Sequence, residues 1–296
     1  VESQSELIRI NDISKSLGVK QNIAIRINPD VDAKTHIKIT TGKAENKFGI
    51  EYDYTESIYK IAADLKNINI AGISVHIGSQ ITSLKPFKKA YTIMYDIIKN
   101  LRSIGHKIDH VDLGGGLGVS YTTEENIPTF KEYANLIQSI FGNADIKVYI
   151  EPGRLLVANS GLLITKVTDV KTTTQKTFII VDAAMNDFIR PTLYGSYHEI
   201  LPVKNNLGTS NKVYDIVGPI CETGDYFAKN RKMNSVKIGS IIAIKSVGAY
   251  GSVQSSNYNS RPQIAEILVK DDKYEIIRER VEVKDLIKQE KIATWL

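Results

Sequence analysis

Two hydrophobic periods alternate along the first half of the chain. Residues 5–17 carry apolar side chains at helical spacing and stop at Gly18, which predicts an amphipathic helix with a glycine cap. A β-branched run at 22–27 predicts a strand, and an amphipathic stretch at 55–65 predicts the next helix. The alternation continues with strands predicted at 70–77, 111–113 and 148–150 and helices at 87–101 and 129–141.

The predicted strands of the first half are almost continuous apolar runs, which is typical of a parallel sheet covered by helices. Repeated strand–helix units of this kind predict an α/β fold. After about Gly161 the pattern changes to short runs rich in Val, Ile, Thr and Tyr, separated by turns such as 205–208, which predicts a mostly antiparallel β domain. We expect a domain boundary near 155–160 and strands at 162–170, 177–181, 213–217, 240–244 and 263–269.

Composition narrows the class of protein. The 296 residues are 42% hydrophobic and 24% charged, which is ordinary for a folded chain and excludes a disordered tail. The net charge of +5 is dispersed along the chain, so the sequence shows no basic patch of the kind that binds nucleic acid. No apolar run reaches the ~18 residues of a membrane helix. The single cysteine, Cys221, excludes a disulfide framework and favours a reducing compartment. We therefore expect a cytoplasmic protein without nucleic-acid or membrane partners.

Polar and glycine residues follow the predicted strands. His76–Gln80 follow one strand, Gly114–Gly118 the next and Glu151–Arg154 the last. Barrels of α/β type place their active sites at these strand ends. A triple glycine lets backbone N–H groups approach an anion such as phosphate, although a tight strand-to-helix turn explains the glycines equally well.

Each candidate also has a structural explanation. Histidines such as His76 are often satisfied core residues, but a position at a strand end favours a functional role. Glu151 and Arg154 could form an ion pair or face a charged ligand together. The chain has no zinc-hydrolase or serine-hydrolase motif, and we expect no metal site. The remaining histidines lie in polar segments, and we expect them at the surface: His36, His106, His110 and His198.

Three further clusters lie in the β domain, at 187–194, 218–225 and 248–251. Taken singly, Cys221 could be a small core residue and Arg190 a solvated surface charge. Taken together, the three clusters resemble a second side of the binding site, one that is rich in hydrogen-bond donors for carboxylate groups.

Seven motifs follow one another in a recognisable order. They are INPDVDAKTHIKITTGKAENKFGI (27–50), HIGSQ (76–80), VDLGGGLG (111–118), EPGR (151–154), DAAMNDFIRPTLY (182–194), GPICETGD (218–225) and GAYG (248–251). The chain thereby resembles the diaminopimelate decarboxylase family, whose members combine an alanine-racemase-like barrel that binds pyridoxal phosphate with a β domain. Ornithine and arginine decarboxylases share some of these motifs, but the IRP-LY and CETGD contexts favour the diaminopimelate branch.

The resemblance implies an architecture and an activity. Residues 1–157 would be the C-terminal part of a pyridoxal-phosphate-binding (β/α)8 barrel, and residues 158–296 a C-terminal β domain. The activity would be conversion of meso-diaminopimelate to L-lysine and CO2, the last step of lysine biosynthesis. Cys221 and Glu222 would reach the partner subunit's site, so the family resemblance implies a homodimer with shared active sites.

The resemblance also implies residue roles. His76 would stack on the pyridine ring, Glu151 would pair with the ring nitrogen, and Cys221 would donate the proton after CO2 is lost, which makes His76 and Cys221 the catalytic pair. The other implied cofactor contacts, most of them around the phosphate, are Ser79, Gly114, Gly115, Gly116, Pro152, Gly153, Arg154 and Tyr250. The implied substrate contacts are Arg154, Arg190, Tyr194, Glu222 and Tyr250.

One family feature has no counterpart. The Schiff-base lysine stands in a Tyr-Ala-x-Lys-Ala context, and Lys43, Lys47 and Lys147 lie in other motifs or at other places. We therefore expect the isolated chain to be poorly folded or inactive without a separate N-terminal segment, as in a truncated product, a split gene or a decayed gene. The alternatives are a non-catalytic remnant of the enzyme and a related ornithine- or arginine-type decarboxylase.

Overall fold

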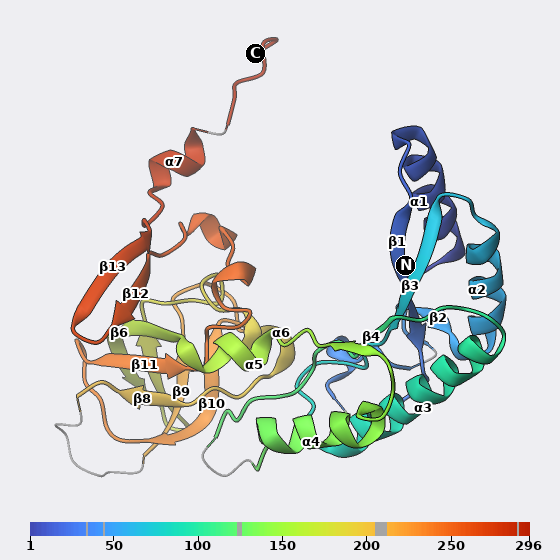
Figure 1. Cartoon of the computed structure of the whole chain (residues 1–296). Helices are drawn as coiled ribbons and strands as arrows, with labels where there is room; N and C mark the ends of the chain where they lie inside the picture. Colours follow the sequence, from blue (N-terminus) through green and yellow to red (C-terminus); the bar gives the residue numbers. More distant parts are fainter. Residues whose placement is uncertain (34, 44, 123–125, 205–211, 289) are drawn as a thin grey trace. The chain divides into compact units, whose positions relative to one another are not determined.

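The computed structural model describes residues 1–296 apart from 34, 44, 123–125, 205–211 and 289, so the turn predicted at 205–208 lies outside the described residues. The chain divides into two compact units (Figure 1). The first comprises Val1–Ser120 and Glu124–Leu156, and the second comprises Val157–Leu296 together with the segment that begins at Tyr121. Each unit is described by itself.

The first unit is a parallel sheet with helices. The strand order is β2-β1-β3-β4-β5, and every neighbouring pair is parallel, as the apolar runs predict. The four predicted helices and four predicted strands are all present, and β2 is an additional two-residue strand. The bounds are β1 Gln21–Asn28, β2 Ile50–Glu51, β3 Ile68–Ser74, β4 His110–Asp112, β5 Lys147–Tyr149, α1 Gln4–Leu17, α2 Thr55–Asp64, α3 Leu84–Ser103 and α4 Phe130–Phe141.

Local sequence signals set the ends of these helices. The Ser3 hydroxyl accepts a hydrogen bond from the Glu6 N–H at the start of α1, and Gly18 closes it in the left-handed conformation at φ 67°. Helix α4 begins with a capping box in which Thr129 and Glu132 satisfy each other's backbone N–H groups. The helix starts are therefore encoded within a few residues.

The core of the first unit joins the sheet to the helices α1, α2, α3 and α4. Ile25, Ile73 and Val111 sit in register on three neighbouring strands and are fully buried. Phe87, Tyr91 and Met94 on the inner face of α3 are also buried. Burial of aliphatic and aromatic side chains of this size supplies about 1.5–3 kcal/mol each.

Strand β5 departs from the expectation of a covered strand. Val148 is 36% exposed and Tyr149 is 51% exposed. The reason is its place in the sheet, because β5 pairs only with β4 among the described strands and has a free edge. An open apolar edge is a surface that another strand can pair with.

The second unit contains a mixed sheet of six strands in the order β10-β9-β7-β6-β11-β8, and a separate β12–β13 hairpin. All pairs are antiparallel except β7 with β9, so the prediction of a mostly antiparallel domain is confirmed. The bounds are β6 Leu162–Thr172, β7 Thr177–Val181, β8 Ile200–Pro202, β9 Lys212–Val217, β10 Tyr226–Met233, β11 Ile241–Lys245, β12 Glu266–Lys270 and β13 Lys273–Arg278, with short helices α6 Arg190–Tyr194 and α7 Val283–Ile287. The short helix α5 Arg154–Val157 belongs to the first unit up to Leu156.

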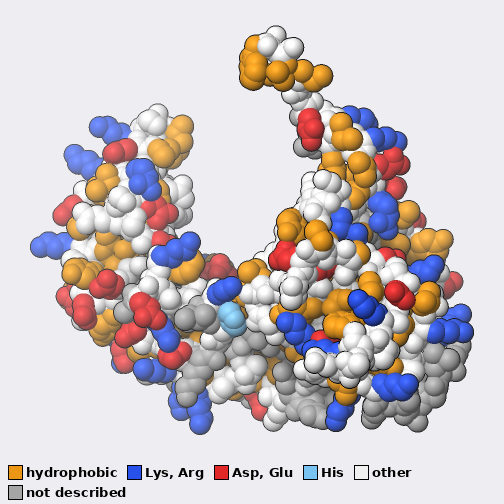
Figure 2. Space-filling model, turned by 180° about the vertical axis from the view of Figure 1, so that it is seen from behind, with side chains coloured by type: hydrophobic (Ala, Val, Ile, Leu, Met, Phe, Trp, Pro, Cys, Tyr) orange, Lys and Arg blue, Asp and Glu red, His pale blue; other side chains and the backbone are white. Residues whose placement is uncertain are grey.

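The surface carries mixed charge. Lysine and arginine side chains alternate with aspartate and glutamate over the face that Figure 2 shows, in keeping with the dispersed charge of the sequence. Among the described residues, no helix combines the length and the hydropathy that a membrane span requires.

Candidate active site

Chemically active residues follow the carboxyl ends of the strands in the first unit. His76 comes two residues after β3, Gly114–Gly116 begin two residues after β4, and Glu151 comes two residues after β5. Because the strands are parallel, their carboxyl ends lie at one edge of the sheet. The fold therefore gathers residues that are far apart in the sequence.

The His76 ring is held in one protonation state. Its Nδ1 accepts a hydrogen bond from the Gly115 N–H at 3.2 Å, so the proton of the neutral ring lies on Nε2. The His76 carbonyl accepts hydrogen bonds from Thr41 Oγ1 at 2.8 Å and Arg26 Nη2 at 3.3 Å. Burial, together with the positive charge of Arg26, lowers the pKa of His76 to about 4. The imidazole is therefore neutral at physiological pH.

The glycine segment is shaped by close backbone contacts. Gly116 has φ 105°, a conformation that side chains disfavour. A Cβ on Gly116 would collide with the Gly78 carbonyl oxygen, and one on Gly115 with the Glu151 carbonyl oxygen. Within the described residues, the N–H groups of Gly116 and Gly153 have no hydrogen-bond acceptor. Two backbone donors are thus available to an anion such as phosphate.

Arg154 and Ser79 meet near these glycines. Arg154 is only 6% exposed, and its Nε and Nη2 donate to the Ser79 hydroxyl at 3.3 and 2.9 Å. The structure therefore brings a buried positive charge to the serine of the HIGSQ motif. This places two of the predicted cofactor-binding residues together.

Two carboxylates lie in the same region of the first unit. Partial desolvation raises the pKa of Glu151, the nearby negative charge of Asp112 raises it further, and Arg26 opposes both. Asp112 Oδ1 accepts the Gly114 N–H at 2.8 Å, and Arg26 is ion-paired with Glu2 at 2.7 Å. A carboxyl group with a raised pKa suits a hydrogen bond to a basic ring nitrogen.

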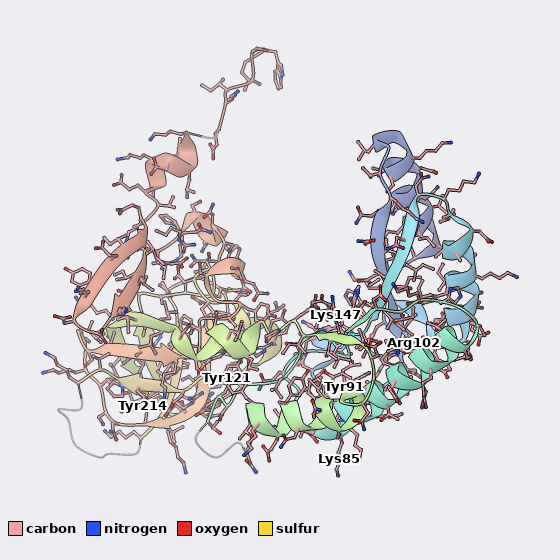
Figure 3. The ribbon with its side chains drawn as sticks, viewed as in Figure 1. Lys85, Tyr91, Arg102, Tyr121, Lys147 and Tyr214 are labelled. Atoms are coloured by element: carbon pink, nitrogen blue, oxygen red, sulfur yellow. The ribbon has the colours of Figure 1, made fainter. Side chains whose placement is uncertain are left out.

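Arg190 at the start of α6 is the central residue of the second unit's polar cluster. It is 5% exposed, which excludes the solvated surface charge that its sequence context also allowed. Its Nη1 donates to the Tyr121 hydroxyl at 2.9 Å, and Tyr121 is labelled in Figure 3. The rings of Tyr121, Tyr194 and Tyr250 lie 5.6, 5.9 and 5.8 Å from its guanidinium carbon. The predicted residues Arg190, Tyr194 and Tyr250 therefore form one cluster.

Cys221 is exposed, so it is not the small core residue that a lone cysteine often is. Asn259 Nδ2 lies 3.7 Å from its sulfur, and the Tyr258 hydroxyl donates to Glu222 Oε2 at 2.6 Å. The same loop is tied to α6, because the Thr192 hydroxyl donates to the Gly224 carbonyl. A thiol and a carboxylate are thus presented side by side from a fixed loop.

A buried carboxylate holds the Cys221 loop in place. Asp225 accepts hydrogen bonds from the Met185 and Ile220 N–H groups, both at 2.7 Å. Desolvation raises its pKa, and these backbone bonds lower it. The loop at 218–225 and the loop at 182–188 are therefore joined through one side chain.

His198 corrects the expectation of a surface histidine. It is fully buried, and its ring packs edge-on against Tyr121 and Phe188 at centroid distances of 4.9 and 4.6 Å. Its Nδ1 lies 2.9 Å from the Lys245 carbonyl oxygen. The polar residues around it in the sequence gave no sign of burial, because aromatic rings from other segments enclose it.

Sequence reasoning missed several residues of these clusters. Asp112 had a signal, since it is an acidic residue within the strand that precedes three glycines. Tyr121, Tyr258 and Asn259 had none, because their partners are remote in the chain.

Comparisons with known proteins identify the family of the chain. Residues 1–158 match the family described as "Pyridoxal-dependent decarboxylase, pyridoxal binding domain". The chain is 46% identical to a diaminopimelate decarboxylase of Zymomonas mobilis over 297 aligned positions, which cover 100% of this chain and 70% of that protein. A crystal structure of diaminopimelate decarboxylase from Helicobacter pylori complexed with L-lysine has a TM-score of 0.92 at 41% identity, covering 98% of this chain and 72% of the other. The corresponding structure from M. jannaschii, also in complex with L-lysine, has a TM-score of 0.93 at 38% identity, covering 100% and 69%.

The fold is that of a pyridoxal-dependent decarboxylase, a class that combines a barrel domain with a β domain. Pyridoxal phosphate is its cofactor. Within that class, the chain belongs to the diaminopimelate decarboxylase family. It spans about 70% of the length of the Zymomonas mobilis relative.

Proposed function

We propose that this chain forms part of a pyridoxal-phosphate-dependent lyase that converts meso-diaminopimelate to L-lysine and CO2, the last step of lysine biosynthesis. The observation that carries the proposal is the strand-end cradle of the first unit. There the neutral His76 ring is bonded to Gly115, next to backbone N–H groups that have no acceptor among the described residues. The identity to diaminopimelate decarboxylases over the whole chain supports this substrate.

The residues of the first unit fit pyridoxal phosphate. When bound, the cofactor's ring withdraws electrons from the substrate carbon that loses CO2. The Gly116 and Gly153 N–H groups suit the phosphate, and the neutral His76 ring can stack on the pyridine without adding a charge. We assign Glu151 to the pyridine nitrogen, where its carboxylate would keep the nitrogen protonated. The remaining predicted cofactor contacts are Ser79, Gly114, Gly115, Pro152, Arg154 and Tyr250.

The second unit supplies the candidate substrate contacts. A guanidinium binds carboxylate through parallel N–H groups, which suits a substrate that carries two carboxylates. We therefore assign Arg190 and Tyr194 to a substrate carboxylate, on the ground of the buried Arg190 cluster. Arg154, Glu222 and Tyr250 stay predicted substrate contacts.

Cys221 is our candidate for the proton donor. Its thiol is exposed at the end of an ordered loop, where it can meet a substrate carbon. After CO2 leaves, the thiol proton passes to that carbon, and the thiolate regains a proton from solvent. We propose that Cys221 and Glu222 act in the partner subunit's site of a homodimer.

Three further assignments belong to the same proposal. The cofactor-binding part comprises residues 1–157, and the β domain comprises residues 158–296. The lysine that carries the cofactor lies outside residues 1–296, because no lysine among them stands in the family's context. The cytoplasm is the compartment we propose, since the chain has a single cysteine.

The test is intact-mass analysis after addition of pyridoxal phosphate and borohydride, which fixes any cofactor–lysine bond. We would treat the chain alone and the chain mixed with the N-terminal part of the Zymomonas mobilis relative. We expect a reduced adduct on the added segment only, accompanied by L-lysine production from diaminopimelate. An adduct on one specific lysine of this chain would overturn the assignment of the lysine.

Two outcomes favour the alternatives. An adduct without lysine production, but with turnover of ornithine or arginine, would favour a related decarboxylase. No specific adduct in either sample would favour a non-catalytic remnant.

A further inference from the structure

The guanidinium of Arg190 has one bonded edge and one vacant edge. Nη1 donates to the Tyr121 hydroxyl at 2.9 Å, whereas the buried Nε has no hydrogen-bond acceptor in the described part of the chain. In a guanidinium group, the N–H bonds of Nε and Nη2 point in the same direction, away from Nη1. The vacant edge is therefore the edge that binds a carboxylate through two parallel hydrogen bonds.

A buried positive charge requires compensation. Arg190 has no carboxylate within ion-pair distance among the residues that the structure describes. The faces of three tyrosine rings stabilise the cation partly, and the Tyr121 oxygen is a neutral acceptor. Burying a charge without a partner is costly, so this cluster is complementary to an anionic group of a ligand.

Tyr121 is itself held rigidly. Its ring packs edge-on against His198 at 4.9 Å and 73°, and His198 is fully buried. Phe188 lies on the His198 ring at 4.6 Å, and His198 Nδ1 lies 2.9 Å from the Lys245 carbonyl oxygen. The edge-on packing of Tyr121, His198 and Phe188 thus sets the position of the Tyr121 hydroxyl.

We propose that Tyr121 is a positioning residue for substrate specificity: its hydroxyl fixes Nη1 of Arg190 and so directs the Nε–Nη2 edge at a substrate carboxylate. This inference rests on the proposed function, because it takes Arg190 as a substrate contact. Tyr121 acts through Arg190, so its effect disappears when the guanidinium is absent. A ring that served packing alone would have no such dependence.

The experiment is calorimetric titration of the full chain, combined with the N-terminal part of the Zymomonas mobilis relative, with meso-diaminopimelate and, as a ligand without carboxylates, with pentane-1,5-diamine. Tyr121→Phe should weaken diaminopimelate binding about tenfold, as expected for one hydrogen bond to a charged group, and leave diamine binding unchanged. Tyr214→Phe is the matched control, since it also removes a buried hydroxyl of the second unit, one that is bonded to Ser235 at 3.3 Å. It should bind both ligands like the parent chain.

A double-variant cycle tests the dependence on Arg190. Arg190→Gln should weaken diaminopimelate binding more than Tyr121→Phe does, and the double variant should bind as Arg190→Gln does. Equal binding by Tyr121→Phe and the parent chain would overturn the proposal. A Tyr121→Phe effect of the same size in the Arg190→Gln background would overturn it as well.

A second readout separates this inference from the proposed function. In the nitrogen-labelled chain, sodium acetate should shift the Arg190 Nε–H resonance, and Tyr121→Phe should require about tenfold more acetate for the same shift. If acetate acts in this way and diaminopimelate does not bind, the proposed substrate is wrong and the positioning role stands. If the two proteins respond alike to acetate, or neither responds, the positioning role is refuted.

Discussion

Mild acid should destabilise the first unit through His76. The pKa of His76 is lowered from 6.5 to about 4 by burial and by the positive charge of Arg26. In the unfolded chain the imidazole binds a proton as the pH falls below about 6.5, whereas in the folded chain it remains neutral until about pH 4. Proton binding therefore lowers the free energy of the unfolded state over this window, and the fold loses stability as the pH falls. The difference between these two pKa values lowers the free energy of unfolding by about 2 kcal/mol at about pH 5 and by almost nothing at about pH 7.5.

The assay compares urea unfolding of the parent chain with that of His76→Gln, which cannot titrate. The substitution can change stability by a constant amount, so the informative quantity is how the difference between the two proteins varies with pH. We expect the parent chain to lose about 2 kcal/mol relative to the variant between about pH 7.5 and about pH 5. His36→Gln, at an exposed histidine, is the control and should follow the parent chain. If the difference in unfolding free energy between the parent chain and the variant stays constant over this range, the conclusion that the half-buried His76 is neutral is wrong.

Three other predictions follow. Gly116→Ala should weaken pyridoxal phosphate binding at least about tenfold in an absorbance titration, because the new Cβ would collide with the Gly78 carbonyl oxygen. Gly105→Ala is the control and should not weaken binding, because Gly105 also has a positive φ but a Cβ there would meet no atom. Tyr91→Phe should cost about 1–3 kcal/mol in urea unfolding, since Tyr133 loses its 2.6 Å partner; an unchanged midpoint would contradict this. Cys221→Ala should lower kcat about a hundredfold or more and leave diaminopimelate affinity intact; unchanged turnover would remove Cys221 from the mechanism.

The candidate site could be anticipated where chemistry follows directly from local sequence. The glycines after β4 and the histidine after β3 stand beside strands whose apolar runs are recognisable, so a parallel sheet brings them to one edge. The helices α1 to α4 were equally predictable, because their periodicity, caps and capping box lie within a few residues, whereas the short helices α5, α6 and α7 were not predicted. The strands β8, β10 and β13 were not predicted. In β10 the reason is its sequence YFAKNRKM, a mixture of polar and apolar residues without strict alternation.

Hydrophobic periodicity by itself determined the order of strands and helices in the first half and the change to a β domain, since each element is encoded within its own residues. The tertiary structure alone decided which side chains meet. Arg190 bonds to Tyr121 although 69 positions separate them, and His198 is enclosed by rings from remote segments. The burial of a side chain and its hydrogen-bond partner depend on how the whole chain packs, so local sequence composition does not predict them.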